Sequence, residues 1–268
     1  LDATKTDFTQ SQLKAMVGRE VLAYAKYHGM KHRPEDKRRC WTIEYDKSTK
    51  FHMDVLPCLP DAENYRKMLT EQGFVELAKS ESMTADALAI TDNTLPNYHV
   101  SSDDWPSSNP IGYAAWFKEQ MAERLRIRKM ELAESMGTMA KVDDIPDHKV
   151  KTTLQKSIQI LKRHRDNMFA NDQDVKPISI IISSLAAHAY ENEDTLTGAL
   201  SSILINMDRY IETRGGVKWV QNPVNPAENF ADKWEENPLL EANFKNWLAS
   251  ARQDFGAYIN TSTPTEVP

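Results

Sequence analysis

The chain has 268 residues, of which 40% are hydrophobic, and its formal net charge is −6. This length suits one large domain or two packed ones, and the hydrophobic fraction is sufficient for a core. The acidic balance gives no reason to expect a sequence-specific nucleic-acid partner. No apolar run approaches the roughly 18 residues that suggest a membrane span, and no signal peptide is visible.

The cysteines and the first residue also bear on the class of protein. Cys40 and Cys58 are too few for a disulfide framework, which favours a reducing cytoplasm. The chain begins with Leu1 rather than Met, so we expect a piece of a longer protein.

The first predicted helix begins at a capping-box pattern. Thr9 is followed three residues later by Gln12, and apolar residues then recur at helical spacing as far as Tyr24. Gly29 provides a plausible stop.

Two strands are predicted next, over residues 39–46 and 50–57, and their short connection indicates an antiparallel hairpin. Alternate residues from Phe51 to Val55 form an apolar face, which we expect to pack on helices. His52 and Asp54 share the opposite face, which we expect to open to a cleft.

The rest of the chain is predicted to be mainly helical. Residues 92–110 are rich in loop-forming residues, and helical periodicity runs from Gly112 to about residue 214. A proline-rich extended stretch at 222–234 leads into a last helix. We therefore expect an α+β protein with a small mixed sheet in its N-terminal part.

Three segments are expected from this pattern. Residues 1–110 carry the strands, residues 111–255 form a helical lobe, and residues 256–268 form a disordered tail.

Asp54 interrupts an apolar run, and a buried carboxylate is costly unless it is paired, hydrogen-bonded or bound to a metal. One interpretation is a solvated or backbone-bonded carboxylate at the end of a strand. The other is a ligand of Mg²⁺, which prefers one or two carboxylates together with substrate phosphates. A metal site needs a partner for Asp54, and the upstream candidate is Asp2.

Lys162 and Arg165 are three residues apart on a predicted helix and share a face. They suit a phosphate clamp, although the two residues by themselves favour a solvated basic face. Ser179 follows Pro177 in the first turn of another helix, where exposed N–H groups favour a phosphate. The alternative is that Ser179 caps its own helix.

Two further patterns have less specific explanations. His28, His32, Cys40 and Cys58 offer zinc ligands, but the cysteines lack the short spacing of a zinc knuckle. The basic residues between 124 and 129 are typical of a solvated helix face.

Five stretches, taken in order, strongly resemble the bacterial cGAS/DncV-like nucleotidyltransferases of the polymerase-β-like superfamily. The resemblance covers residues 2 to about 250, nearly the whole chain. The stretches are RRCWTIEYDKSTKFHMDVLPCLPD, SSNPIGYAAWF, LQKSIQILKRHRDNMF, KPISIIISSLAA and NPVNPAENFADKW.

The resemblance implies that residues 1–110 are part of a nucleotidyltransferase core and that the helical lobe of residues 111–255 completes a nucleotide cleft. It also implies roles for particular residues. Asp54 matches the third catalytic aspartate of the family, and Asp2 looks like the second member of its Asp-x-Asp pair. The first member and the family's Gly-Ser motif are absent from this sequence. Lys162 and Ser179 match the lysine and serine that hold the donor triphosphate, and Arg165 lies beside them.

The resemblance also implies an activity. Family members use Mg²⁺ or Mn²⁺ to condense ATP or other nucleoside triphosphates into cyclic oligonucleotide signals of anti-phage defence. A two-metal site suits this chemistry, because nucleotidyl transfer depends on positioning and charge neutralisation. We expect a cyclic di- or trinucleotide product and accessory or activator proteins as partners. The alternatives are a linear oligoadenylate or RNA nucleotidyltransferase, and an inactive nucleotide-binding module.

Overall fold

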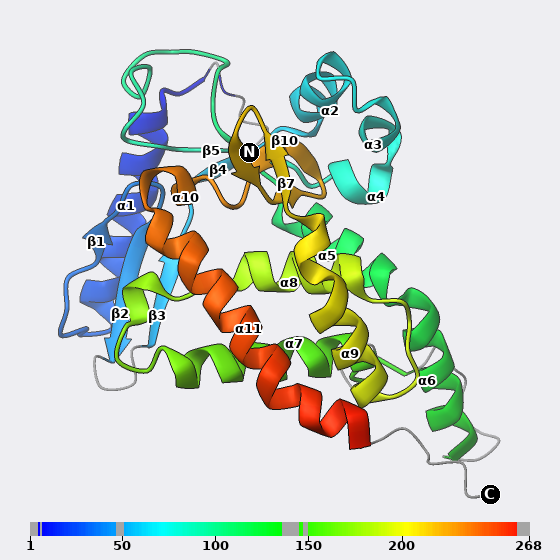
Figure 1. Cartoon of the computed structure of the whole chain (residues 1–268). Coiled ribbons are helices and arrows are strands. Elements are labelled where there is room, and N and C mark those ends of the chain that lie inside the picture. Colours follow the sequence, from blue (N-terminus) through cyan, green and yellow to red (C-terminus); the bar gives the residue numbers. More distant parts are fainter. Residues whose placement is uncertain (1–4, 6, 47–50, 136–144, 147–149, 262–268) are drawn as a thin grey trace, which may run out of the picture. The chain divides into compact units, whose positions relative to one another are not determined.

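The computed structural model describes residues 5, 7–46, 51–135, 145–146 and 150–261. The chain divides into two compact units, Leu1–Tyr113 and Ala114–Pro268 (Figure 1). Each unit is described by itself below. The first contains short strands and helices, and the second is mainly helical, so the predicted α+β class is confirmed.

Helix α1 (Gln10–Tyr27) begins where the capping box predicted. The Thr9 hydroxyl accepts the backbone N–H of Gln12, and the Gln12 side chain accepts the backbone N–H of Thr9. The helix ends at Tyr27, and Gly29 then adopts a positive φ of 59°, which glycine tolerates without strain.

The predicted hairpin is present. Strands β1 (Glu35–Asp36), β2 (Trp41–Asp46) and β3 (Phe51–Val55) form an antiparallel sheet in that order. Thr42 lies opposite Asp54 in the register.

The expected burial of the apolar face of β3 is only partly right. Ile43 of β2 is 1% exposed and lies on this face, but its cross-strand partner Met53 is 41% exposed, and Phe51 is 60% exposed. Helix α1 contacts β2, whereas β3 is an edge strand within the described sheet. The apolar pattern therefore identified the face correctly, but not how far the helix covers it.

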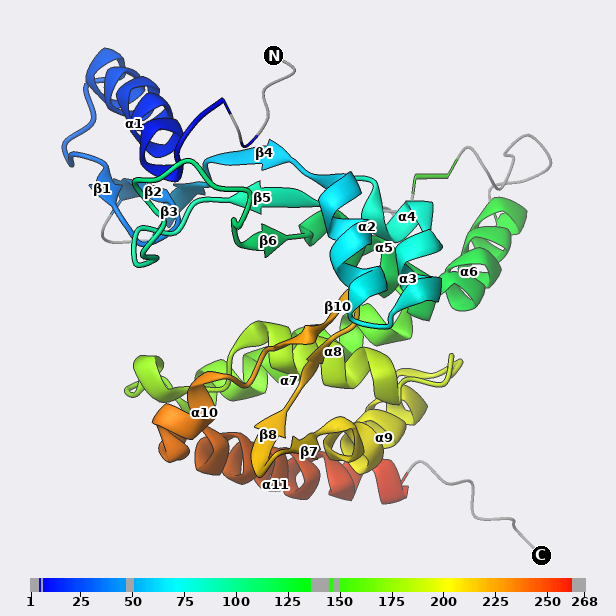
Figure 2. The ribbon, with the colours of Figure 1, turned by 90° about the horizontal axis from the view of Figure 1, so that it is seen from above.

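A second sheet in the first unit joins β4 (Cys58–Pro60), β5 (Leu88–Ile90) and β6 (Ser107–Ser108), seen side by side in Figure 2. A mixed sheet was expected, but the strand pairs formed by the described residues are all antiparallel. Three helices connect β4 to β5, namely α2 (Ala62–Glu71), α3 (Val75–Lys79) and α4 (Glu81–Thr84).

Asp92, just after β5, ties three segments of the first unit together. Its side chain is 1% exposed and accepts hydrogen bonds from Arg38 and Arg39, which immediately precede β2. Thr94 donates to the same carboxylate, and the Asp92 backbone N–H donates to the side chain of Gln10 in α1. Burial alone raises the pKa of the Asp92 carboxyl, but the bonds from Arg38, Thr94 and Arg39 outweigh it and hold the pKa well below its ordinary value.

Lys14 and Trp41 form a second set of contacts between α1 and the start of β2. The buried Lys14 ammonium donates to the backbone carbonyls of Lys37 and Arg38 and pairs with Asp36. The Trp41 indole donates to the Lys14 carbonyl at 3.1 Å, and its ring lies against Gly18. The close approach leaves no room for a β-carbon at position 18.

The second unit is built from long helices that enclose an apolar core. Leu154, Leu161, Ile203 and Trp247 are fully buried. The helices are α5 (Pro110–Gln120, which begins in the first unit), α6 (Ala122–Ser135), α7 (Thr153–Met168), α8 (Ser179–Ala189), α9 (Leu196–Asn206) and α11 (Pro238–Thr261).

Short elements complete this unit. They are the 3-10 helices η3 (Gln173–Val175) and η4 (Met207–Tyr210), the strand pairs β7 (Glu212–Arg214) with β8 (Val217–Trp219) and β9 (Gln221–Asn222) with β10 (Asn225–Asn229), and helix α10 (Lys233–Glu236).

Helix α11 continues to Thr261, into the segment 256–268 that was expected to be disordered; residues 262–268 lie outside the described part of the chain. Among the helices that the structure describes, none has the length and apolar character needed to cross a membrane.

We predict that Gly18→Ala destabilises the protein. The added methyl group would lie 2.6 Å from Cε2 of the Trp41 indole, so the helix or the ring must shift, at a cost of about 1–3 kcal/mol. Urea unfolding measures this cost. Gly256→Ala is the matched control, because the space around Gly256 is open and the same change in a helix stabilises by roughly 0.5–1 kcal/mol. Equal effects of the two substitutions would contradict the packing argument.

We predict that Asp92→Asn lowers the free energy of unfolding at pH 7 by about 1–3 kcal/mol, because charge-assisted hydrogen bonds from two arginines are lost. The folded pKa of Asp92 is depressed, so its contribution is present above the unfolded value of about 3.9 and is lost as pH falls through the folded pKa. The difference between wild type and variant should thus be constant from pH 7 to 5 and shrink below about pH 4. A difference that grows in acid would contradict this assignment.

Candidate active site

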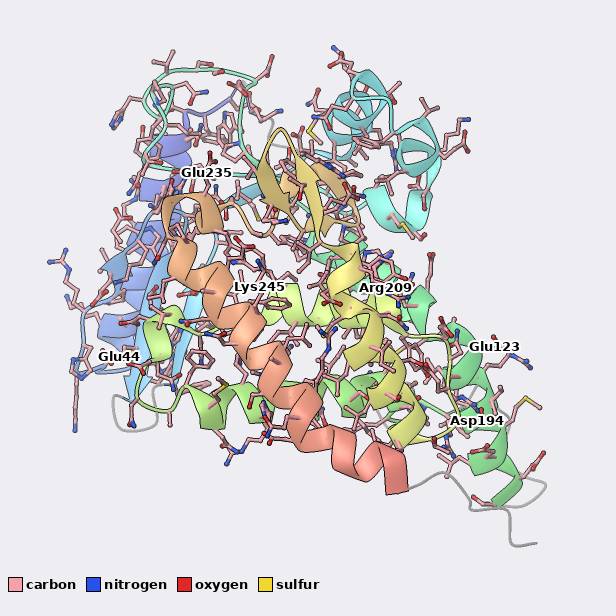
Figure 3. The ribbon with its side chains drawn as sticks, viewed as in Figure 1. Glu44, Glu123, Asp194, Arg209, Glu235 and Lys245 are labelled. Carbon is pink, nitrogen blue, oxygen red and sulfur yellow. The ribbon has the colours of Figure 1, made fainter. Side chains whose placement is uncertain are left out.

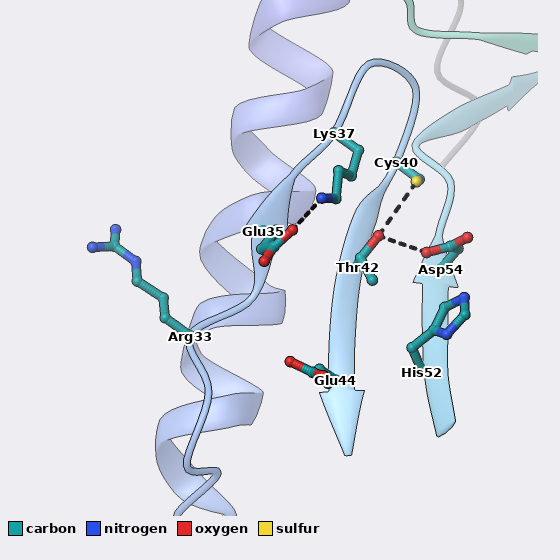
Figure 4. A pocket seen from close by; sticks show the side chains of 8 residues that line it. All are labelled: Arg33, Glu35, Lys37, Cys40, Thr42, Glu44, His52 and Asp54. Atoms are coloured by element: carbon teal, nitrogen blue, oxygen red, sulfur yellow. Dashed lines mark hydrogen bonds and ion pairs between the residues drawn. The ribbon is translucent and has the colours of Figure 1, made fainter. Parts of the chain in front are cut away.

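The polar face of the β2–β3 hairpin lines a cavity of about 560 Å³ in the first unit (Figure 4). Thr42, His52 and Asp54 project from the two strands, and Cys40 lies just before β2. The cavity also contains the cations Arg33 and Lys37 and the carboxylates Glu35 and Glu44. The prediction that His52 and Asp54 share a face opening to a cavity is confirmed.

Asp54 is exposed, and its orientation is set by its cross-strand neighbour. The Thr42 hydroxyl donates to Oδ1 of Asp54 at 2.6 Å, and Sγ of Cys40 lies 3.8 Å from the same hydroxyl (Figure 4). Water reaches Asp54, so its charge is stable without a bound metal. The exposure of Asp54 therefore does not require Mg²⁺ to compensate a buried charge. What distinguishes Asp54 is its fixed orientation toward an open cavity.

The neighbours of Asp54 carry charges of both signs. Lys37 donates to Glu35, and this hydrogen bond raises the pKa of the lysine. Burial raises the pKa of the Cys40 thiol, and the charge of Asp54 adds to that shift. Cys40 is therefore a neutral thiol near neutral pH rather than a thiolate ligand.

The described residues contain no group of three histidine, cysteine, aspartate or glutamate side chains able to hold a metal. The zinc interpretation of His28, His32, Cys40 and Cys58 thus has no support in their geometry. Asp54 alone suits one position in the coordination of Mg²⁺ or Mn²⁺, with phosphate oxygens and water completing it. Asp2, its predicted partner, lies outside the described residues.

In the second unit, Arg165 connects the end of α7 to the start of α8. Its side chain is 5% exposed and donates to the Pro177 carbonyl at 2.9 Å and to the Ser179 hydroxyl at 3.0 Å. The other guanidinium nitrogens donate to Asp166, which also pairs with Lys176. The predicted phosphate clamp has Arg165 binding a phosphate of the ligand. In the structure its guanidinium instead donates hydrogen bonds to other groups of the protein.

Lys162 lies one turn before Arg165 on α7 and is partly buried. Burial lowers the pKa of its ammonium group, and the nearby Arg165 lowers it further, while Asp166 acts in the opposite direction. A bound polyphosphate would relieve the repulsion between these cations.

Ser179 is the first residue of α8 and is exposed. The N-cap position belongs to Ile178, which makes no side-chain cap. Ser179 therefore does not cap its helix as the alternative proposed. Its hydroxyl is held by Arg165 beside the unpaired N–H groups of the first turn.

The basic residues between 124 and 129 are not all solvated as expected. Arg124 is 5% exposed, and its guanidinium pairs with Asp194 and donates to the Asn192 carbonyl. Figure 3 shows Asp194 beside α6. Arg128 donates to the Asp194 carbonyl, so this run fixes the loop ahead of α9.

The chain is similar in sequence to curated cyclic dinucleotide synthases. No protein-family model matches the chain. A c-di-GMP synthase of Roseivirga ehrenbergii is 27% identical over 224 residues, covering 82% of this chain and 50% of that protein. The cyclic dinucleotide synthase CdnG of Bradyrhizobium diazoefficiens is 26% identical over 226 residues, covering 78% of this chain and 48% of that protein.

This chain is a homologue of cyclic dinucleotide synthases. It spans about half the length of the curated relatives it matches. The solved structure of Bradyrhizobium diazoefficiens CdnG in complex with GTP is similar with a TM-score of 0.57 and 19% identity, over 91% of this chain and 67% of that one. This likeness shows that this chain has the fold of that CD-NTase.

Two residues of the candidate site were not predicted from the sequence. Thr42 orients Asp54, and Asp166 holds Arg165. The role of Thr42 could have been predicted from the sequence, because the hairpin register pairs it with Asp54. Asp166 carried no such signal, because an acidic residue next to an arginine on a helix is common on solvated faces.

Proposed function

We propose that this protein is a cyclic dinucleotide synthase, a nucleotidyltransferase that joins two nucleoside triphosphates and releases pyrophosphate. The observation that carries the proposal is the orientation of Asp54 over an open polar cavity by Thr42, in a homologue of cyclic dinucleotide synthases. The proposal assigns metal binding to an acidic group of the first unit, and triphosphate binding to a cation and a helix terminus of the second.

In this proposal Asp54 holds a catalytic divalent cation, together with Asp2. Mg²⁺ or Mn²⁺, when bound, supplies charge neutralisation at the reacting phosphate. Thr42 acts as a positioning residue, because its hydroxyl fixes which oxygen of Asp54 remains directed to the cavity. Asp2 enters the proposal by resemblance alone.

Lys162 and Ser179 bind the donor triphosphate in this proposal. Lys162 contributes a point charge, and Ser179 contributes a hydroxyl next to the exposed N–H groups of α8. Arg165 positions Ser179 rather than binding phosphate directly, since its donors serve Ser179, Pro177 and Asp166.

Guanine nucleotides are the first substrates to test. One relative is named a c-di-GMP synthase, and another was solved in complex with GTP. We therefore propose GTP as a substrate, where the sequence placed ATP first, and a dinucleotide rather than a trinucleotide ring. A role of the product as a cytoplasmic signal in anti-phage defence, read by a separate effector, belongs to the same proposal.

The activity is tested with the protein at its natural length. The protein is incubated with each nucleoside triphosphate alone and with all four, in Mg²⁺ or Mn²⁺, and phosphatase-resistant products are analysed by mass spectrometry. We expect a cyclic dinucleotide that contains guanine. Linear products with free ends would favour an oligoadenylate-type or RNA-tailing enzyme, and no product under any condition would favour a binding module.

We predict that Asp54→Asn reduces turnover by about 10²-fold or more, the scale of removing one preorganised electrostatic group. Thermal stability should change little, because Asp54 is exposed and Thr42 can still donate to the amide oxygen. Glu71→Gln on α2 removes an exposed carboxylate from the same unit and serves as the control. Wild-type turnover by Asp54→Asn would contradict the assignment.

We predict that triphosphate affinity depends on the protonation of Lys162. Its pKa lies below the ordinary lysine value, so affinity for a non-hydrolysable GTP analogue should fall as pH rises through that lowered pKa. Lys162→Met should weaken binding by about tenfold or more and flatten this pH dependence. Lys233→Met, an exposed cation in the same unit, should leave the profile unchanged. Parallel profiles for wild type and Lys162→Met would show that another group titrates.

A further inference from the structure

A second cavity, of about 520 Å³, lies within the helical unit where α7, α9 and α11 pack on one another (Figure 1). None of its lining residues belongs to the site proposed above. Its size falls within the range of small-molecule sites, roughly 300–1,000 Å³.

The cavity has an apolar part contributed by all three helices. Ile160 of α7, Leu196 of α9 and Phe255 of α11 line it, and each is partly buried. An aromatic ring and two branched aliphatic side chains form a surface suited to a flat heterocycle.

The cavity also carries two cations on α7. Lys156 and Arg163 line it, are exposed, and are seven residues apart, which places them about 10 Å apart along the helix axis. In the part of the chain that the structure describes, neither side chain has an ion pair or hydrogen bond. The opposite side of the helix, with Leu154 and Leu161, lies in the core.

His164 adds a polar group to the same wall. Its Nε2 lies 2.8 Å from Oδ2 of Asp254, and because a carboxylate only accepts, Nε2 carries the hydrogen. Nδ1 is buried and has no hydrogen-bond partner among the described residues. In the neutral ring this atom is an acceptor, and leaving it unsatisfied costs free energy. Because Nδ1 is enclosed, His164 serves the cavity through its ring, whose centroid lies 5.5 Å from that of Phe255.

We propose that this cavity is a second nucleotide-binding site, which takes a nucleoside phosphate. Lys156 and Arg163 bind the phosphate, and the base lies against the rings of Phe255 and His164 and their apolar neighbours. The site is separate from the triphosphate site, since Lys162 projects from a different side of α7 than Ile160 does. Two nucleotide sites on one helix allow one nucleotide to influence the binding of another.

The test measures equilibrium binding of GMP without divalent cations in the Lys162→Met background, which weakens the proposed triphosphate site. We expect Lys156→Glu with Arg163→Glu to weaken GMP binding at least tenfold. The control reverses the charges of two other exposed cations of the unit, Arg126 and Arg209, of which Arg209 is labelled in Figure 3, and should change the affinity less than twofold. Equal affinities for the cavity variant and the control would overturn the proposal.

Two further ligands define the chemistry. Guanosine and inorganic phosphate should each bind at least tenfold more weakly than GMP, because each uses half of the site. Inorganic phosphate as tight as GMP would overturn the role of the apolar wall. Photolabelling with 8-azido-GMP should modify peptides that contain residues 156–167 or Phe255, and labelling elsewhere alone would place the nucleotide outside this cavity. These readouts need no turnover, so they are independent of whether the protein is a synthase.

Discussion

Asp92 accepts hydrogen bonds from Arg38 and Arg39 just ahead of β2, and its backbone N–H donates to Gln10 in α1. The carboxylate is almost fully buried, so its charge is tolerable only while these donors remain in place. The arginines lie just ahead of β2, and the register of β2 with β3 brings Thr42 opposite Asp54. The junction at Asp92 therefore anchors the start of the strand that carries Thr42, although it takes no part in the proposed catalysis.

The sequence predicted local structure well where one physical rule decides it. The capping box at Thr9 places the start of α1, and the alternation around Asp54 identifies its face, because strand geometry requires both. The sequence did not predict the exposure of Phe51, because how far α1 covers the apolar face of the sheet depends on the position of the helix. The Asp92 junction was also missed, because it joins residues more than fifty positions apart that no local pattern connects.

Arg165 shows the same limit at the level of function. A lysine and an arginine three residues apart are a reasonable phosphate clamp in sequence, and both face one region of the helical unit. Burial decides between them. The arginine is enclosed and organises the start of α8, whereas the lysine remains accessible with a lowered pKa. Such a division between a binding residue and a residue that positions its neighbour requires the fold.

The central claim is that Asp54 holds a divalent cation beside the reacting nucleotide. Binding of Mn²⁺ in the presence of a non-hydrolysable GTP analogue, followed by electron paramagnetic resonance in wild type and Asp54→Asn at natural length, tests it most directly. The account predicts that the variant binds Mn²⁺ at least about tenfold more weakly, as expected when one charged ligand is removed. An identical Mn²⁺ affinity and spectrum in the two proteins would contradict it.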